Sequence, residues 1–379
     1  MTPIRVLHCP ETVGGNPGQL ARAERELGLD SVSIAFDNEP FAYEVDEVLW
    51  QPGDGPLRHE LKRWSLLRRA LRDFDVIHFN FGSSIMPRRV PLLAGPPPPV
   101  AAPLRVAYGL YARLVELRDL PLLRRAGKGI VVTYQGDDAR QGDDSRERYD
   151  LSLASVPGYF GQREDEAKRR HIAVFDRYAD RIFALNPDLL AVLPDRAEFL
   201  PYASVDPAAW VPSFREPTEL VRIVHAPSNR RAKGTEYIVS AVERLQAENV
   251  PVELELVEGL THVEARRLYG QADIVVDQLL AGWYGSFAVE MMALGKPVVA
   301  YVREEDLVHV PDEMRAELPV ISATPDTIAD VVRRLATDER RRLPELGRRG
   351  RAYVEHWHEP HAIARRLKGV YEEIVQSRR

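Results

Sequence analysis

Short runs of apolar and β-branched residues alternate with segments of helical spacing through the first half of the chain. Such runs predict β-strands, and apolar residues that recur every three to four positions predict helices between them. The predicted strands are 4–8, 30–36, 75–81, 129–134, 180–185 and 198–203, and the predicted helices include 17–27, 59–71 and 164–178. This alternation favours parallel strands joined by crossover helices.

The second half repeats the alternation with almost unbroken Val/Ile runs, which suit strands covered on both faces. Strands are predicted at 221–226, 252–257, 273–279 and 297–302, and helices at 235–248, 262–272 and 286–294. Residues 204–219, between the halves, are rich in proline and show no periodicity. A chain of 379 residues also exceeds the size at which one hydrophobic core stops growing. We therefore expect an α/β protein with domains at 1–205 and 219–358, a linker at 206–218 and a final segment at 359–379.

The overall charge argues against a nucleic-acid-binding protein. The chain has 51 Lys and Arg residues against 57 Asp and Glu residues, a net charge of −6, so a basic excess is missing. Its one cysteine, Cys9, cannot form an intramolecular disulfide, which favours a reducing compartment. The sequence shows neither a signal-peptide pattern nor an apolar stretch near the ~20 residues that span a bilayer. We expect a cytoplasmic protein with no nucleic acid among its partners.

One segment departs from the acidic average. Residues 86–130 contain eight Lys and Arg residues and two acidic residues, a local charge of +6. This polarity predicts that the segment belongs to the acceptor side, where it meets an anionic acceptor or makes peripheral contact with the inner face of the cell membrane. A soluble lid with scattered arginines is the alternative.

The segment 282–301 carries the most specific candidate chemistry. Gly285 precedes a predicted helix, so the free N–H groups of Ser286 and Phe287 and the positive helix end form an anion site that suits a phosphate. Glu290 lies one turn further along the same face, where its carboxylate could accept two hydrogen bonds from a ribose diol. An ordinary turn with a solvated Glu290 is the alternative.

The turn 225–237 crowds Arg230, Arg231 and Lys233 between a predicted strand and a helix. Ligands bind at the carboxyl edge of parallel sheets, so these cations would neutralise a diphosphate there. A solvated basic turn is the alternative, because Lys and Arg are the usual surface residues.

A Gly-Gly loop near the N-terminus completes the pattern, since Gly14 and Gly15 let the backbone approach a ligand closely. Together these elements resemble the GT-B glycosyltransferases, in particular the retaining enzymes of glycosyltransferase family 4. The resemblance covers essentially the whole chain, including the Lys233–Gly234 pair, the donor loop that ends at Glu290 and the Gly-Lys-Pro at 295–297.

The resemblance implies two Rossmann-like parallel-sheet domains that face each other across a cleft, with the last helix, roughly 360–377, returning to the first domain. The first domain would bind the acceptor and the second a nucleotide-sugar donor. The implied activity is metal-independent sugar transfer with retention and without a cofactor, to a sugar, a lipid-linked acceptor or a small molecule. Segments 225–235 and 277–285 resemble a subgroup associated with bacterial surface polysaccharide, glycolipid or secondary-metabolite glycosylation.

The resemblance also assigns roles to residues. Lys233 with Arg230 or Arg231 would bind the diphosphate, Glu290 would hold the ribose, and residues 257–260 would lie near the base. Gly15 would approach the phosphates from the other domain. The donor-binding candidates are Gly14, Gly15, Asn229, Arg231, Glu258, Gly285, Ser286, Phe287 and Glu290, and the catalytic candidates are Lys233, Arg230, Gln135 and Asp138.

Two positions depart from the family pattern. The first of the family's two glutamates, which are eight positions apart, falls on Gly282. In the family's His-Gly-x-Asp segment, Gln135 replaces the histidine and Asp138 aligns with the aspartate; Gln135 can donate a hydrogen bond to a sugar oxygen but cannot carry charge. Two alternatives therefore stay open: a GT-B enzyme of another reaction type, such as an epimerase or an enzyme that couples non-sugar rings, and a non-catalytic GT-B partner protein.

Three further segments have plainer interpretations. The histidines within 356–361 lack a carboxylate pair or a cysteine, so we interpret them as the turn into the last helix and predict no metal site. Trp283 and Tyr284 suit a buried core and a sugar platform equally. The acidic run 304–306 is predicted to be a solvated face.

Overall fold

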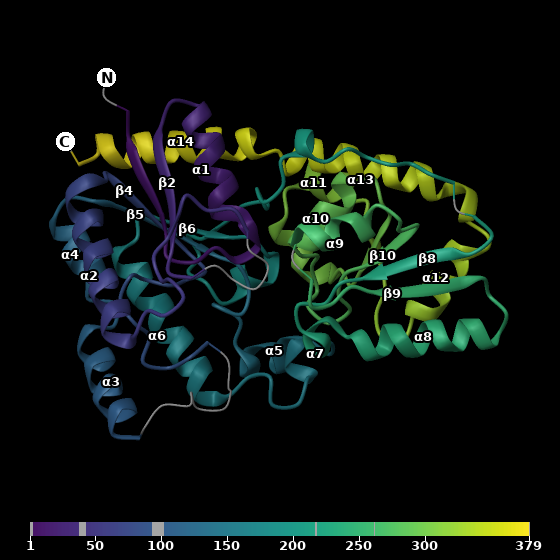
Figure 1. The fold of residues 1–379 in the computed structure, drawn as a ribbon, viewed down its shortest axis with the longest axis horizontal. Helices are drawn as coiled ribbons and strands as arrows, with labels where there is room; N and C mark the ends of the chain where they lie inside the picture. Colours follow the sequence, from purple (N-terminus) through teal and green to yellow (C-terminus); the bar gives the residue numbers. More distant parts are fainter. Residues whose placement is uncertain (1–2, 38–42, 93–101, 217, 261, 379) are drawn as a thin grey trace.

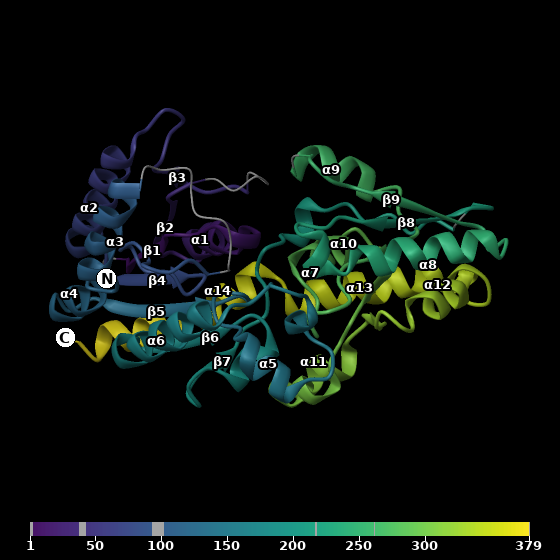
Figure 2. The same ribbon diagram turned by 90° about the horizontal axis from the view of Figure 1, so that it is seen from below.

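Two parallel β-sheets form the framework of the molecule (Figures 1 and 2). The computed structural model describes residues 3–37, 43–92, 102–216, 218–260 and 262–378. Within them, a seven-stranded sheet has the order β3-β2-β1-β4-β5-β6-β7 and a five-stranded sheet the order β12-β11-β10-β8-β9. Every strand pair is parallel. This architecture confirms the predicted α/β class.

The first sheet is built around Val- and Ile-rich strands whose side chains are buried on both faces, as the unbroken apolar runs require. Its strands are β1 Arg5–Cys9, β2 Asp30–Ala35, β3 Glu47–Val48, β4 Val76–Asn80, β5 Gly129–Tyr134, β6 Arg181–Ala184 and β7 Glu198–Phe199. The accompanying helices are α1 Asn16–Glu26, α2 Pro56–Asp73, α3 Ala102–Val115, α4 Asp119–Arg125, α5 Gly142–Arg148 and α6 Gln162–Tyr178.

The second sheet follows the same pattern with fewer strands. Its strands are β8 Val221–His225, β9 Val252–Leu256, β10 Ile274–Val276, β11 Val298–Ala300 and β12 Ile321–Ser322. The helices that follow the start of this sheet are α7 Arg230–Lys233, α8 Thr235–Ala247, α9 His262–Tyr269, α10 Ser286–Ala293, α11 Asp312–Glu317, α12 Ile328–Ala336, α13 Leu343–Trp357 and α14 Pro360–Gln376. Among the described residues, every helix is too short or too polar to cross a lipid bilayer.

The last helix, α14, lies on the first sheet's half of the molecule, next to α1 (Figure 1). The Tyr371 hydroxyl donates to Glu24 Oε1 at 3.1 Å and lies 2.7 Å from His78 Nδ1, all three side chains being buried. Lys368 Nζ donates to the Leu27 carbonyl at 2.8 Å. Hydrogen bonds among buried polar groups are costly to leave unmade, so this network fixes α14 against the first sheet.

The proline-rich segment between the sheets is held against α13. Arg351 Nη1 donates to the carbonyls of Trp210 and Ala293, at 2.6 and 2.7 Å, and Nη2 donates to the Pro207 carbonyl at 2.9 Å. One guanidinium group therefore satisfies two backbone acceptors of the linking segment and one at the end of α10, and so ties the segment to the second domain.

Candidate functional site

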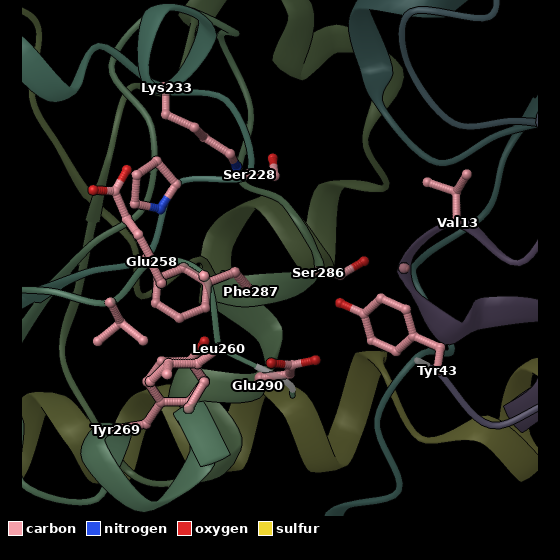
Figure 3. A pocket seen from close by; sticks show the side chains of 16 residues that line it. Val13, Tyr43, Ser228, Lys233, Glu258, Leu260, Tyr269, Ser286, Phe287 and Glu290 are labelled. Atoms are coloured by element: carbon pink, nitrogen blue, oxygen red, sulfur yellow. The ribbon is translucent and has the colours of Figure 1, made fainter. Parts of the chain in front are cut away.

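A cavity of about 250 Å³ lies between the two halves of the molecule (Figure 3). Its walls come from loops at the carboxyl ends of β1, β8 and β9 and from α9 and α10, which is where open α/β sheets bind ligands. The lining residues are Val13, Gly14, Tyr43, Ala226, Pro227, Ser228, Lys233, Val257, Glu258, Gly259, Leu260, Ala265, Tyr269, Ser286, Phe287 and Glu290. Six of the predicted site residues are thus brought together: Gly14, Lys233, Glu258, Ser286, Phe287 and Glu290.

A buried carboxylate, Asp277, organises the cationic side of the cavity. Asp277 directly follows β10; its Oδ1 accepts from Lys233 Nζ at 2.7 Å, and its Oδ2 accepts from the Gly285 N–H at 2.7 Å. Lys233 also donates to Gln278 Oε1 at 2.8 Å. The ammonium group is thereby held beside the first turn of α10, whose N-cap is Gly285. Asp277 is not among the residues predicted from the sequence, although an acidic residue immediately after a buried Val/Ile strand is a visible signal.

The N-terminal glycine loop touches the start of α10 from the other domain. Gly14 has a φ of +66°, and a Cβ there would lie 2.6 Å from Ser286 Oγ. A Cβ on Gly15, which has a φ of +71°, would lie 2.8 Å from the Tyr43 ring. Both positions therefore require glycine, for backbone conformation and for space. Figure 3 shows Val13 and Tyr43 facing Ser286 and Glu290 across the cavity.

Glu290 is 3% exposed, yet it lines the cavity one turn along α10 from Ser286. Beside Glu290 the cavity has an aromatic wall, where the rings of Tyr269 and Phe287 meet at 5.2 Å with an interplanar angle of 63°. Burial, with a smaller contribution from the Glu290 carboxylate, raises the pKa of Tyr269 above its usual value. The cavity thus combines a cation, a helix N-terminus, a buried carboxylate and an aromatic wall.

The sequence matches no protein-family model and no curated protein. Among solved structures, sucrose-phosphate synthase from Thermosynechococcus elongatus is similar over 100% of both chains, with a TM-score of 0.61 and 16% identity. HepE from Anabaena, in complex with UDP-glucose, matches over 97% of this chain and 99% of its own, with a TM-score of 0.57 and 12% identity. A glycosyltransferase from Rickettsia africae matches over 99% of this chain and 100% of its own, with a TM-score of 0.56 and 12% identity. The chain has the GT-B fold.

The arginines of the α7 turn lie outside the lining of the GT-B cavity. Arg230 donates to Glu236 at 2.8 Å and to Glu258 at 2.9 Å, and Arg231 donates to the carbonyl of Pro157 in the first domain. We predicted that one of these arginines joins Lys233 at a diphosphate. In the structure, both guanidinium groups already donate to neighbouring protein oxygens, so either arginine would have to exchange these partners for the diphosphate. Asn229 also lies outside the lining and caps α7, accepting from the Ala232 N–H at 3.1 Å.

Gln135 and Asp138 form a buried turn after β5, apart from the residues that line this GT-B cavity. The Asp138 carboxylate accepts from the backbone N–H of Gln135 at 3.0 Å and of Gly136 at 2.6 Å. Burial raises the pKa of Asp138 to about 6, against those two hydrogen bonds. Gln135 Nε2 is buried and has no hydrogen-bond partner within the described part of the chain. That amide can donate a hydrogen bond, but it is not among the groups that line the cavity.

Gly282 stands where the resembling family has a glutamate, and the guanidinium group of Arg303 fills the space beside it. Gly282 has a φ of +78°, and a Cβ there would lie 2.5 Å from Arg303 Nη1. Arg303 pairs with Asp306 at 2.7 Å, donates to the Leu151 carbonyl of the first domain at 2.9 Å and stacks over the Tyr149 ring at 3.6 Å. Of the acidic run 304–306, Glu304 and Glu305 are exposed as predicted, but Asp306 is 3% exposed, so the prediction was wrong for that residue. The ion pair with Arg303 and the Tyr149 hydroxyl compensate the burial of Asp306.

Histidines near the last turn have separate partners. His356 Nδ1 lies 2.9 Å from Glu317, and His361 Nε2 lies 2.5 Å from Glu26. His358 is buried, with Nε2 2.9 Å from the Tyr284 hydroxyl. A cluster of three or more His, Cys, Asp or Glu side chains suited to a metal is absent from the described residues.

Trp283 and Tyr284 are core residues. Their exposed fractions are 1% and 0%, and their rings pack at a centroid distance of 4.4 Å. Of the two interpretations left open, a buried core and a sugar platform, the structure supports the first.

Proposed function

We propose that this protein is a retaining glycosyltransferase that moves a sugar from a nucleoside diphosphate sugar to an acceptor. The observation that carries the proposal is the interdomain cavity, which Lys233, the N-terminus of α10 and, one helical turn along α10, the buried Glu290 carboxylate all line. A cation and a helix end suit a diphosphate, and a carboxylate suits a ribose diol. HepE, whose structures hold UDP and UDP-glucose, shares the fold, which makes a uridine nucleotide the first donor to test.

In the proposed reaction, negative charge collects on the diphosphate as the glycosidic bond breaks. The Lys233 ammonium, oriented by Asp277 and Gln278, and the free N–H groups at the start of α10 stabilise that charge. The departing diphosphate oxygen takes the proton of the acceptor hydroxyl, so the scheme needs no side-chain base. Neither a metal ion nor a cofactor enters the scheme, and the nucleotide-sugar is a substrate.

The acceptor would bind against the first domain, on the side of the cavity that Val13, Gly14 and Tyr43 form. The acceptor in this proposal is a sugar, a lipid-linked compound or a small molecule. The enzyme would act in the cytoplasm, in the synthesis of a bacterial surface glycan or a secondary metabolite.

The test begins with thermal melting in the presence of UDP, GDP, dTDP and ADP. A nucleotide at 100 times its Kd stabilises the folded state by about 2.7 kcal/mol, so one of the four should raise the Tm by several degrees. The corresponding sugar nucleotide is then incubated with acceptor mixtures, and nucleotide release and the anomeric configuration of the product are measured. Absence of stabilisation by all four nucleotides at millimolar concentration would contradict the proposal.

One observation favours a second candidate, a GT-B protein without transferase turnover or with another reaction. Arg303 fills the space beside Gly282, so the side chain that would contact the donor sugar in the resembling family is replaced by an interdomain contact. Nucleotide binding without sugar release from any donor would favour a non-catalytic role, whereas an altered sugar nucleotide in the product would favour an epimerase.

A further inference from the structure

Exposed apolar side chains concentrate at one place on the first domain. Of the fourteen large apolar side chains that are exposed in the described part of the chain, nine lie in α2, α3 and α4. Figures 1 and 2 show α2 and α3 at the edge of the first domain, on the side away from the second sheet. This surface is therefore separate from the interdomain cavity.

Helices α2 and α3 pack side by side and run in the same direction. Glu60 accepts hydrogen bonds from the Tyr108 hydroxyl at 3.0 Å and the Tyr111 hydroxyl at 2.7 Å, and Trp64 Nε1 donates to Tyr111 at 2.8 Å. Residue 60 thus lies beside 108 and residue 64 beside 111, which fixes the parallel register. These polar groups therefore form hydrogen bonds with one another between the two helices.

The side of the helix pair that faces away from the core is apolar. At 100° per residue, positions 57, 61 and 64 form one row along α2, and positions 106, 110 and 114 form one row along α3. Because the helices are parallel and in this register, both rows lie on the same side of the pair, away from the core. We call it the outer face; its residues are Leu57, Leu61, Trp64, Val106, Leu110 and Leu114.

The leucines of the outer face are largely exposed to solvent. Leu57, Leu61, Leu110 and Leu114 are 76%, 63%, 59% and 72% exposed. A helix that is apolar on most of its sides, as α3 is, is normally buried. A contiguous exposed apolar surface of this kind marks an interaction site.

Most cations of α2 and α3 are paired, Arg58 and Lys62 with Asp54 and Arg69 with Glu47, but in the described part of the chain two unpaired arginines remain beside this apolar surface. Helices α2 and α3 contain eight Lys and Arg residues and two acidic residues, Glu60 and Asp73. Glu60 is held between the helices, and Asp73 accepts from Arg72 at 2.6 Å. Arg68 and Arg113 are exposed beside the outer face and, within the described residues, form no hydrogen bond or ion pair.

The basic segment 86–130 does not form this surface as a whole, and its residues 93–101 lie outside the described chain. Arg88 donates to the Gly82 carbonyl at 2.6 Å, and Arg124 pairs with Asp180 at 2.6 Å, so both guanidinium groups already have partners within the domain. The cations that remain toward solvent at the outer face come from both α2 and α3.

We propose that the outer face of α2 and α3 docks on an anionic lipid bilayer. The leucines and Trp64 enter the interfacial region, and Arg68 and Arg113 contact lipid phosphates. Apolar burial and attraction to anionic headgroups act together in such interfacial helices, and neither requires a membrane-spanning segment. The proposal goes beyond the proposed function and does not depend on it, because docking involves no residue of the cavity.

The test is cosedimentation of the full chain with vesicles of phosphatidylcholine alone and of phosphatidylcholine with phosphatidylglycerol. We expect binding to the anionic vesicles at low salt and weaker binding as salt is added. The double variant L110Q/L114Q should bind at least tenfold more weakly. Each of R68Q and R113Q should lower binding to anionic vesicles about fivefold, corresponding to about 1 kcal/mol per cation near the surface.

The matched control is V211Q/V308Q, which changes two valines that are 80% and 72% exposed elsewhere on the molecule and should bind as the unaltered chain does. Thermal melting of every variant verifies folding, and the arginine variants provide the test if the leucine pair melts early. Failure to bind anionic vesicles at low salt, or full binding by L110Q/L114Q, would overturn the proposal. A dimer that L110Q/L114Q dissociates, without vesicle binding, would assign the outer face to a second copy and overturn it as well.

Discussion

Replacing Lys233 with methionine should expose the role of the buried carboxylate beside it. Methionine keeps most of the aliphatic stem but removes the ammonium group that contacts Asp277 at 2.7 Å and Gln278 at 2.8 Å. Asp277 keeps its hydrogen bond from Gly285 but loses its counter-charge. The Lys233 side chain is 15% exposed and the Asp277 side chain is 0% exposed, so little water can reach Asp277 to replace the ammonium group.

The magnitude follows from that burial. Removing one partner of a buried ion pair costs about 3–5 kcal/mol, and the partial exposure of Lys233 places the value near the lower end, about 3 kcal/mol. For domains of this size, 1 kcal/mol corresponds to about 2–4 °C in Tm, so Lys233→Met should melt roughly 6–12 °C earlier. Adding Asp277→Asn should restore much of the loss, because an amide needs no counter-charge and can still accept from Gly285.

Thermal and denaturant unfolding of the single and double variants measure this coupling. Arg230→Met is the control on the same turn: its pairs with Glu236 and Glu258 are exposed, and such pairs contribute up to about 1 kcal/mol. The double variant also isolates binding, because a folded protein without the ammonium group should bind the correct nucleotide at least tenfold more weakly. Unchanged melting of Lys233→Met, or no rescue by Asp277→Asn, would refute this account of the pair.

Three further predictions concern the donor, metal independence and pH. Glu290→Ala should weaken nucleotide binding by about 1–3 kcal/mol in calorimetry, and similarly for UDP-type and UDP-sugar-type ligands, because the ribose is remote from the bond that breaks; unchanged affinity would place the carboxylate away from the ribose. EDTA should leave donor binding and turnover intact, and activity lost in EDTA and restored by one metal would contradict the scheme. Burial raises the pKa of Asp119 to about 6, so the native state holds its proton more tightly than the unfolded chain and the stability contribution falls by up to about 3 kcal/mol as the pH rises from about 4 to above 6. Asp119→Asn should flatten that part of the pH profile of the free energy of unfolding, and an unaltered profile would show that Asp119 does not titrate there.

The central strands could be predicted from the sequence because their signal is local. The run GIVVTY predicts a strand at 129–134, and β5 occupies those residues. The strand predicted at 198–203 ends at Phe199, and further along this segment the Ala203 N–H donates to Asn16 Oδ1 at 2.6 Å instead of continuing a ladder. The two-residue strands β3 and β12 were not predicted, because two residues are too few to show a period.

The candidate site could be predicted where its residues lie close together in the sequence. Ser286 and Glu290 are one turn apart on a single helix, and both line the cavity. The arginines of α7 were harder to place, since a count of cations in a turn does not reveal that Glu236 and Glu258 fold onto Arg230. Asp277 reaches Lys233 only because β10 pairs with β8, a neighbour relation that no local pattern encodes.

The missing glutamate at Gly282 is part of a wider local arrangement. A side chain at this position would collide with the Arg303 guanidinium and would also have to adopt a φ of +78°. Arg303 in turn reaches Leu151 of the first domain, and Asp306 reaches Tyr149. Glycine at 282 and arginine at 303 therefore belong together: the glycine makes the space that the arginine needs for the interdomain contact.

That contact bears on the cavity because both depend on how the two domains meet. On one side, the glycine loop after β1 reaches the start of α10, where a Cβ on Gly14 would lie 2.6 Å from Ser286 Oγ. On another, Leu153, Val156 and Phe160 of the first domain pack with Ala232, Leu280 and Ala281 of the second. The cavity has its observed shape only while these contacts persist, since residues of both domains form its wall. A donor held by Lys233 and Ser286 would thus be bound by a site that the domain contact assembles, and the exchange of a carboxylate for glycine at 282 strengthens that contact through Arg303.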